Sequence, residues 1–244
     1  MGYRQYIRRM IVQFASFFYA SRSSKVIFYH DLHVDHLNTD MSTHIDLFRR
    51  HIQIIRDFDY EIVPEITQEK GQVQICFDDG FSGIHHHLDV IKELDVYIKL
   101  FVVTDNIDQI GYLNRVQLID LSLNKNINIQ SHTHTHRRLS CLSKEDLIWE
   151  LKTSKSILEE IISCNVDSLC FPEGRYSNNV INIALECGYN SLYSSLPGFY
   201  HQFNINKIIN RSLVQHSEES EFRSILKGGD NLLYYWYKLK HKSI

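Results

Sequence analysis

The chain has 244 residues, of which 43% are hydrophobic and 23% charged, and its formal net charge is -3 at pH 7. This length suits one large domain or two small ones, with enough apolar residues for a core that needs no disulfides. The near-neutral charge gives no basic surface for nucleic acid, so we expect no nucleic-acid partner. The five cysteines are scattered without a Cys-x-x-Cys pair, which favours a reducing compartment.

Residues 1–24 form a basic and apolar N-terminal segment. Arg4, Arg8 and Arg9 precede the short apolar run 10–20, which falls below the ~20 residues that span a bilayer. Two interpretations stay open for this segment. One is a cleaved secretory signal, and the other is an amphipathic helix packed on the domain or resting on a membrane surface.

From residue 25 onward, predicted strands alternate with predicted helices. The strands are expected at 25–30, 73–77, 97–103, 127–130, 166–171, 190–195 and 207–214. The helices are expected at 43–56, 84–94, 114–124, 143–163, 178–187 and 218–226. This alternation predicts an α/β fold with a parallel sheet, either closed as a barrel or open and doubly wound. We expect the main domain at 25–227 and a basic, aromatic tail at 228–244.

Two polar motifs follow predicted strands and carry the candidate chemistry. Asp78 and Asp79 end the strand 73–77, and His132 and His136 follow another strand. One carboxylate and two imidazoles make a ligand set that suits a catalytic Zn²⁺ with an open position. The second carboxylate is then free to take a proton from an activated water. These motifs therefore predict a metal-dependent hydrolase.

The same motifs resemble those of the polysaccharide deacetylases, the carbohydrate esterase family that contains chitin and peptidoglycan deacetylases. Residues 77–80 (FDDG) are similar to that family's (T)FDDG motif, and residues 131–136 (SHTHTH) fit its SH(T/S)xxH motif. Residues 171–176 resemble the third motif, usually RPPYG, and residues 28–30 the tyrosine-histidine pair that opens many members. The likeness covers about residues 26–226.

The resemblance implies a distorted (β/α) barrel with about seven parallel strands and one divalent metal, most often zinc. Asp79, His132 and His136 would bind that metal, and Asp78 would be the general base acting on a metal-activated water. The implied reaction is removal of an N-acetyl group from a sugar. That sugar would belong to a cell-surface polysaccharide or its precursor.

Several positions depart from the family pattern. Cys170 stands where the family has an arginine beside the base, so we expect Arg211 to supply a guanidinium to Asp78. Glu173 replaces the family tyrosine, although its backbone N–H can still stabilise an oxyanion. The nearest match to the final Leu-x-His motif makes His216 the candidate general acid.

Substrate contacts are expected from His30 at the end of the first strand and from Pro172, Glu173 and Gly174 in the third motif. Two alternatives remain open: a metal-dependent amidohydrolase acting on a non-carbohydrate amide, and a weakly active sugar-binding relative. We expect a location in the cytoplasm or at the inner face of the membrane, with peripheral membrane contact through the terminal segments.

Overall fold

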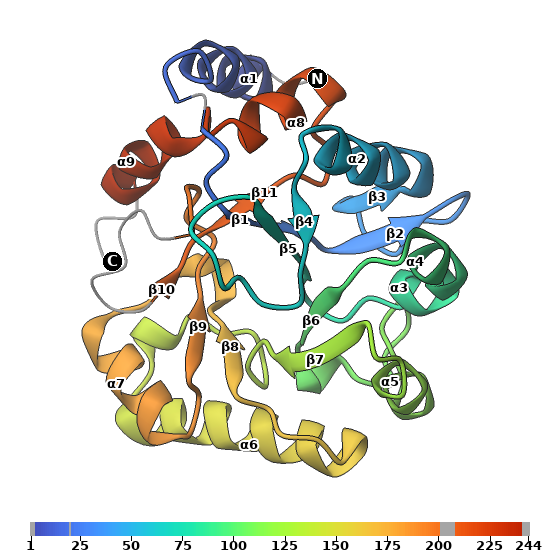
Figure 1. Ribbon diagram of the computed structural model, residues 1–244. Coiled ribbons are helices and arrows are strands. Elements are labelled where there is room, and N and C mark those ends of the chain that lie inside the picture. Colours follow the sequence, from blue (N-terminus) through green and yellow to red (C-terminus); the bar gives the residue numbers. More distant parts are fainter. Residues whose placement is uncertain (1–2, 20, 201–207, 241–244) are drawn as a thin grey trace.

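The computed structural model describes residues 3–19, 21–200 and 208–240, and in this part of the chain it shows a parallel sheet ringed by helices (Figure 1). The sheet has nine strands in the order β10-β9-β8-β7-β6-β5-β1-β11, with β4 paired to β5. Its strands are β1 (Lys25–Tyr29), β4 (Glu61–Ile62), β5 (Gln72–Phe77), β6 (Ile98–Val102), β7 (Ile127–Ser131), β8 (Ser168–Cys170), β9 (Ser191–Tyr193), β10 (Ile208–Ile209) and β11 (Arg211–Leu213). A separate parallel pair contains β2 (Asp31–His33) and β3 (Ser42–His44).

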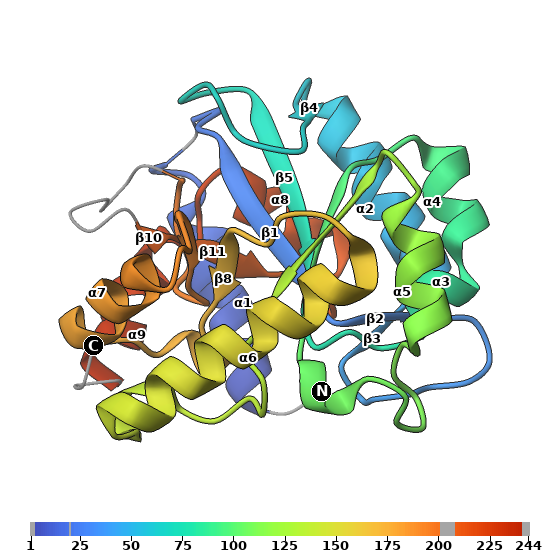
Figure 2. The same ribbon diagram turned by 90° about the horizontal axis from the view of Figure 1, so that it is seen from below.

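The helices surround the strands in Figure 1 and cover the outer face of the sheet when the molecule is turned in Figure 2. They are α1 (Tyr3–Ala15), α2 (Ile45–Asp57), α3 (Gly83–His86), α4 (Leu88–Leu94), α5 (Arg115–Ser122), α6 (Lys144–Ile162), α7 (Asn178–Glu186), α8 (Glu219–Leu226) and α9 (Asn231–Lys240). None of the helices within the described ranges combines the length and apolarity needed to cross a membrane.

The sheet curls until its two edges lie close together. Strands β10 and β11 stand at opposite ends of the strand order, yet Asn210 alone separates them along the chain. Such a short link requires the sheet to bend round on itself, as in a barrel. The parallel order confirms the predicted α/β fold.

The strand count differs from the expected seven because the predicted strand 207–214 divides at Asn210. Its first part pairs with β9, and its second part pairs with β1 on the other edge. The two-residue strand β4 adds a further member. The predicted helix 84–94 also divides, because His87 leaves helical geometry between α3 and α4.

The pleat of each strand separates two apolar cores. In β1, Ile27 and Tyr29 join the large core beneath the helices, whereas Val26 and Phe28 join a smaller core inside the curled sheet. This alternation follows from the two-residue period of a strand. The smaller core, which includes Phe101, lies beneath the polar residues at the carboxyl ends of the strands.

Candidate active site

The carboxyl end of β5 turns sharply and sends its two aspartates into different surroundings. Asp79 (φ 72°) and Gly80 (φ 80°) both adopt left-handed backbone conformations. A side chain at residue 80 would also press against Val102, so glycine is required there. The Asp78 side chain is 3% exposed and the Asp79 side chain 14% exposed. Adjacent carboxylates can therefore hold separate roles.

Asp78 forms a buried ion pair with Arg211. Arg211 Nη1 donates to Asp78 Oδ1 and Arg211 Nη2 donates to Oδ2, both at 2.7 Å. The guanidinium is fully buried between the rings of Phe28 and Phe101, with centroid distances of 4.4 and 5.4 Å. Burial by itself would raise the pKa of Asp78, but the charge and hydrogen bonds of Arg211 lower that pKa to about 2. The carboxylate therefore stays ionised.

Cys170 lies beside this pair, at the position where the family arginine was expected. Its Sγ is 2.9 Å from Arg211 Nη2 and 3.8 Å from Asp78 Oδ2. A cysteine side chain leaves room for a guanidinium arriving from β11 instead of β8. The structure thus places the Arg211 guanidinium against Asp78, the position expected for it from the sequence.

Asp79, His132 and His136 form a second group, here called the metal cluster. Asp79 Oδ1 lies 3.5 Å from His132 Nε2 and 3.7 Å from His136 Nε2, and the three ligand atoms are all within 4.8 Å of one another. Donors at ~2.0–2.1 Å around a tetrahedral ion would stand about 3.4 Å apart. The spacing in the metal cluster therefore fits one divalent ion after a small adjustment.

The protonation states of the two imidazoles and of the Asp79 carboxyl group also suit the binding of a cation. His132 Nδ1 donates to the Cys170 carbonyl at 2.8 Å, which leaves Nε2 as the free lone pair facing Asp79. Burial lowers the pKa of His132 to about 3 and also lowers the pKa of His136, so both rings are neutral. Burial raises the pKa of Asp79 to about 6, a cost that a bound cation would remove. Two neutral imidazoles and one carboxylate make a typical zinc set.

The loop that carries His136 is held by Glu150, a residue that the motifs did not indicate. Thr133 (φ 69°) and His136 (φ 57°) both occupy the left-handed region, which is strained for these residues. The buried Glu150 carboxylate accepts hydrogen bonds from the His134 and Thr135 backbone N–H groups at 3.0 and 2.9 Å. It also accepts hydrogen bonds from the Thr135 hydroxyl and from Arg137 Nε. One side chain thus fixes the curvature of the loop.

A sequence signal for Glu150 did exist. Leu147, Leu151 and Ser154 mark the buried face of α6, and Glu150 falls on that same face. A glutamate on the core side of an amphipathic helix requires a polar partner. The turn after β7 is that partner.

Of the two candidate histidines outside the metal cluster, His30 is the one that lies toward the carboxylates. Its ring lies close enough to act electrostatically on both Asp78 and Asp79, and its Nδ1 hydrogen-bonds Gln215 Oε1. His216 is exposed, and its charge acts on His33. The residue of segment 213–216 that faces the site is therefore Gln215.

The third motif forms a tight turn beside the metal cluster. Pro172 and Gly174 are buried, and Glu173 has a left-handed backbone with φ 55°. A side chain at position 174 would collide with the backbone of Ser195. Burial lowers the pKa of His136 and the negative charge of Glu173 offsets part of that lowering, which places the turn beside the metal cluster.

Tyr112 is a further neighbour that the motifs did not indicate. Leu113 N–H donates to the Gly80 carbonyl at 2.9 Å, so this loop crosses the turn that contains Asp79. The Tyr112 ring stacks on Phe81 with centroids 4.6 Å apart, and it stays partly exposed. Burial and the nearby charge of Asp79 raise the pKa of Tyr112. An exposed aromatic face therefore borders the metal cluster.

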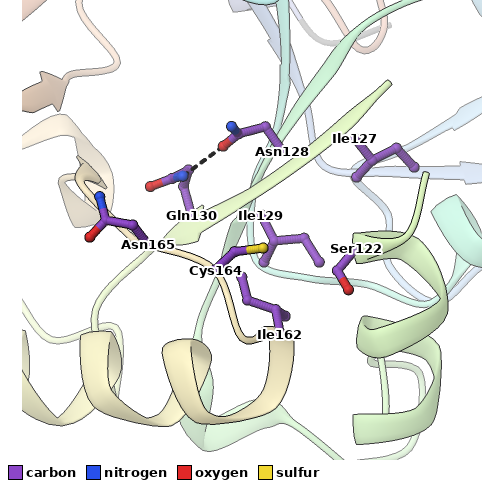
Figure 3. Close-up of a pocket in the computed structure, with 8 residues that line it drawn as sticks. All are labelled: Ser122, Ile127, Asn128, Ile129, Gln130, Ile162, Cys164 and Asn165. Carbon is purple, nitrogen blue, oxygen red and sulfur yellow. Dashed lines mark hydrogen bonds between the residues drawn. The ribbon is translucent and has the colours of Figure 1, made fainter. Parts of the chain in front are cut away.

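A pocket at the other end of β7 lacks comparable chemistry (Figure 3). It lies between the start of that strand and the ends of α5 and α6, and it is lined by Ser122, Ile127, Asn128, Ile129, Gln130, Ile162, Cys164 and Asn165. These residues include no carboxylate, imidazole or cationic group. Active sites of barrel enzymes lie at the carboxyl ends of the strands, where the metal cluster is.

Comparison with known proteins agrees with this geometry. Residues 65–192 match the family model of polysaccharide deacetylases, and the chain belongs to that family. The family supports deacetylation of a carbohydrate as the general reaction. Comparison with curated protein sequences gave no match.

Solved structures share the fold at low sequence identity. Streptococcus pyogenes deacetylase PplD, in complex with acetate, is 21% identical with a TM-score of 0.72 over 83% of this chain and 96% of that chain. The polysaccharide deacetylase BC0361 from Bacillus cereus is 21% identical with a TM-score of 0.72, over 84% and 69% of the two chains. IcaB from Ammonifex degensii is 14% identical with a TM-score of 0.72, over 86% and 97%.

Proposed function

We propose that this chain is a metal-dependent hydrolase that removes an N-acetyl group from a sugar of a cell-surface polysaccharide or its precursor. One observation carries the proposal. Two adjacent carboxylates have opposite surroundings, with Asp78 paired to a buried guanidinium and Asp79 placed against two neutral imidazoles. This division gives one carboxylate to proton transfer and the other to metal binding.

Asp79, His132 and His136 would hold one divalent metal, for which zinc fits the donor set best. When bound, such an ion supplies a Lewis acid that polarises the acyl oxygen and acidifies a water molecule. The Cys170 carbonyl keeps His132 Nε2 free for this purpose, and Glu150 keeps His136 in place through its loop.

Asp78 acts as the general base in this proposal. Its two oxygens each use one lone pair on Arg211, so each keeps another for the proton of the attacking water. Arg211 holds the carboxylate in one orientation and keeps it ionised. The buried pair therefore presents a fixed proton acceptor beside the metal cluster.

His30 is better placed than His216 to protonate the leaving nitrogen. An amide oxygen only accepts hydrogen bonds, so the contact with Gln215 Oε1 fixes the proton on His30 Nδ1 and leaves Nε2 to exchange a proton. The expected role of His216 thus moves to His30 in this proposal.

The test compares the same substitution at two adjacent positions. Asp78→Asn is expected to keep about one equivalent of metal and to lower acetate release from N-acetylated oligosaccharides by about 10²–10⁴-fold. Asp79→Asn is expected to lose the metal. Full activity of Asp78→Asn would rule out its role as the base.

Two alternatives give different results in the same assays. Calorimetric binding of a sugar without acetate release would indicate a binding protein, and hydrolysis limited to small non-sugar amides would indicate another amidohydrolase. The Asp78–Arg211 pair argues against the binding protein, because β11 supplies the guanidinium that Cys170 does not.

A further inference from the structure

The outer side of α1 and of the turn that follows it carries a stripe of large apolar side chains. Every member is at least one-third exposed, and the three phenylalanines are the most exposed, at 66%, 82% and 73%. The stripe contains Ile7, Met10, Ile11, Phe14, Phe17 and Phe18. Its spacing of three and four residues places these side chains along one side of the helix. We call this set the α1 stripe.

The polar side of the same helix faces the protein. Arg8 pairs with the carboxylate of Glu221, and Arg9 pairs with Glu218 at 2.5 Å. Gln13 Nε2 donates to Ser220 Oγ at 3.1 Å, so two successive turns of α1 are bonded to α8 or to the residue before it. These contacts prevent the helix from rolling its apolar side inward.

Close backbone packing fixes the orientation further. Val12 and Ala15 are fully buried on the inner side. A Cβ at Gly229, between α8 and α9, would approach the Val12 carbonyl to 2.1 Å. The packing of α1 therefore fixes the α1 stripe so that it points away from the domain.

The sequences of α1 and of the neighbouring α9 are basic overall, and within α1 Arg8 and Arg9 are paired with Glu221 and Glu218. The sequence of α1 contains three arginines and no acidic residue. The neighbouring α9 contains two lysines, no acidic residue and four consecutive aromatics at 234–237. Phenylalanines flanked by basic residues and by Tyr and Trp are typical of helices that lie in the interface of a membrane.

We propose that the α1 stripe docks the protein onto an anionic lipid surface, with α1 parallel to the membrane plane. The stripe itself has no polar side chain that could form the directional hydrogen bonds of a specific protein interface. A lipid surface needs only apolar insertion and positive charge nearby. This inference concerns the location of the chain and is independent of its catalytic chemistry.

The experiment measures co-sedimentation of the full chain with vesicles. Wild-type protein is expected to bind vesicles of phosphatidylcholine mixed with phosphatidylglycerol, with weaker binding to phosphatidylcholine alone and at high salt. In the triple variant Phe14→Gln/Phe17→Gln/Phe18→Gln, the vesicle partition coefficient is expected to fall by about a hundredfold or more. These side chains are mostly exposed, so the fold should persist, which circular dichroism would verify.

A matched control removes the same number of exposed apolar side chains elsewhere. Ile110→Gln/Leu123→Gln/Leu185→Gln changes residues that are 101%, 81% and 45% exposed and lie outside α1. This variant is expected to bind vesicles like the wild type. Equal loss in both variants, or unchanged binding in the α1 variant, would overturn the proposal.

A second copy of the chain is the competing occupant. Light scattering of the wild type without lipid is expected to show no dimer that depends on the α1 stripe. A dimer that disappears in the Phe14→Gln/Phe17→Gln/Phe18→Gln variant, together with no binding of the wild type to vesicles, would assign the stripe to self-association and refute the lipid surface.

Discussion

The metal cluster and the Asp78–Arg211 pair lie side by side but are built in different ways. The metal cluster takes its ligands from two short motifs, each at the end of one strand. The Asp78–Arg211 pair joins residues 133 positions apart, and its neighbours come from three further strand regions. A metal ion needs a few ligands at fixed spacing, whereas a buried charge needs pairing and hydrogen bonds from several elements to offset its desolvation. The second arrangement should therefore be the more sensitive to single substitutions.

Removal of the guanidinium is expected to have the largest effect. Arg211→Met leaves an unpaired carboxylate inside the sheet, which typically costs about 3–5 kcal/mol. We also expect about a thousandfold lower acetate release, because the base loses its ionised and oriented state. Urea unfolding and initial rates measure the two losses.

Acid unfolding of the metal-free proteins gives an independent check on this pair. In the wild type, the pKa of Asp78 is lowered from 3.8 to about 2, so its contribution to stability exists above pH 3.8 and is lost as the pH falls toward 2. In Arg211→Met, burial alone raises that pKa. The pH dependence of the Asp78 contribution to stability then has the opposite sign, and acidification should stabilise the variant relative to the wild type. Parallel pH profiles would contradict the assignment.

Substitutions at His30 and His216 test which of the two residues is the general acid. His30→Asn is expected to lower kcat by about 10²-fold because the leaving nitrogen loses its proton donor. His216→Asn, at an exposed position, is expected to keep kcat within about twofold. A larger loss at His216 than at His30 would return the acid role to the final motif.

Substitution of Glu150 should have a milder effect, seen as a change in the metal affinity of the metal cluster. Glu150→Gln removes a charged acceptor from the loop that carries His136, and we expect metal affinity to fall by about 10–100-fold. Competition with a chelator measures this change. Glu145→Gln, exposed on the same helix, is the control and should leave affinity unchanged.

Tyr112 should give the smallest effect, limited to substrate binding. Stacking on a sugar ring predicts that Tyr112→Ala raises KM for oligosaccharides by about tenfold, whereas Tyr112→Phe retains most of the affinity. Equal KM values for the alanine variant and the wild type would remove Tyr112 from the binding surface.

The sequence predicted most elements because their periodicity is local, and it predicted that Asp79, His132 and His136 would lie together because both motifs end strands. Pairing of Arg211 with Asp78 was also expected, from the missing arginine at Cys170. The division at Asn210 could not be predicted, since it depends on where the two edges of the sheet meet. Glu150 was missed although its place on the buried face of α6 was a signal, and Tyr112 was missed because its role arises from a contact with a turn distant in sequence.

The one-residue link at Asn210 has a consequence for synthesis of the chain. Arg211 follows the link directly, so the partner of Asp78 leaves the ribosome only after most of the chain has been made. Until β11 docks against β1, Asp78 has no cation, and burying it is unfavourable. The proposed base thus becomes competent only when β11 docks against β1, and nascent or truncated chains should be inactive.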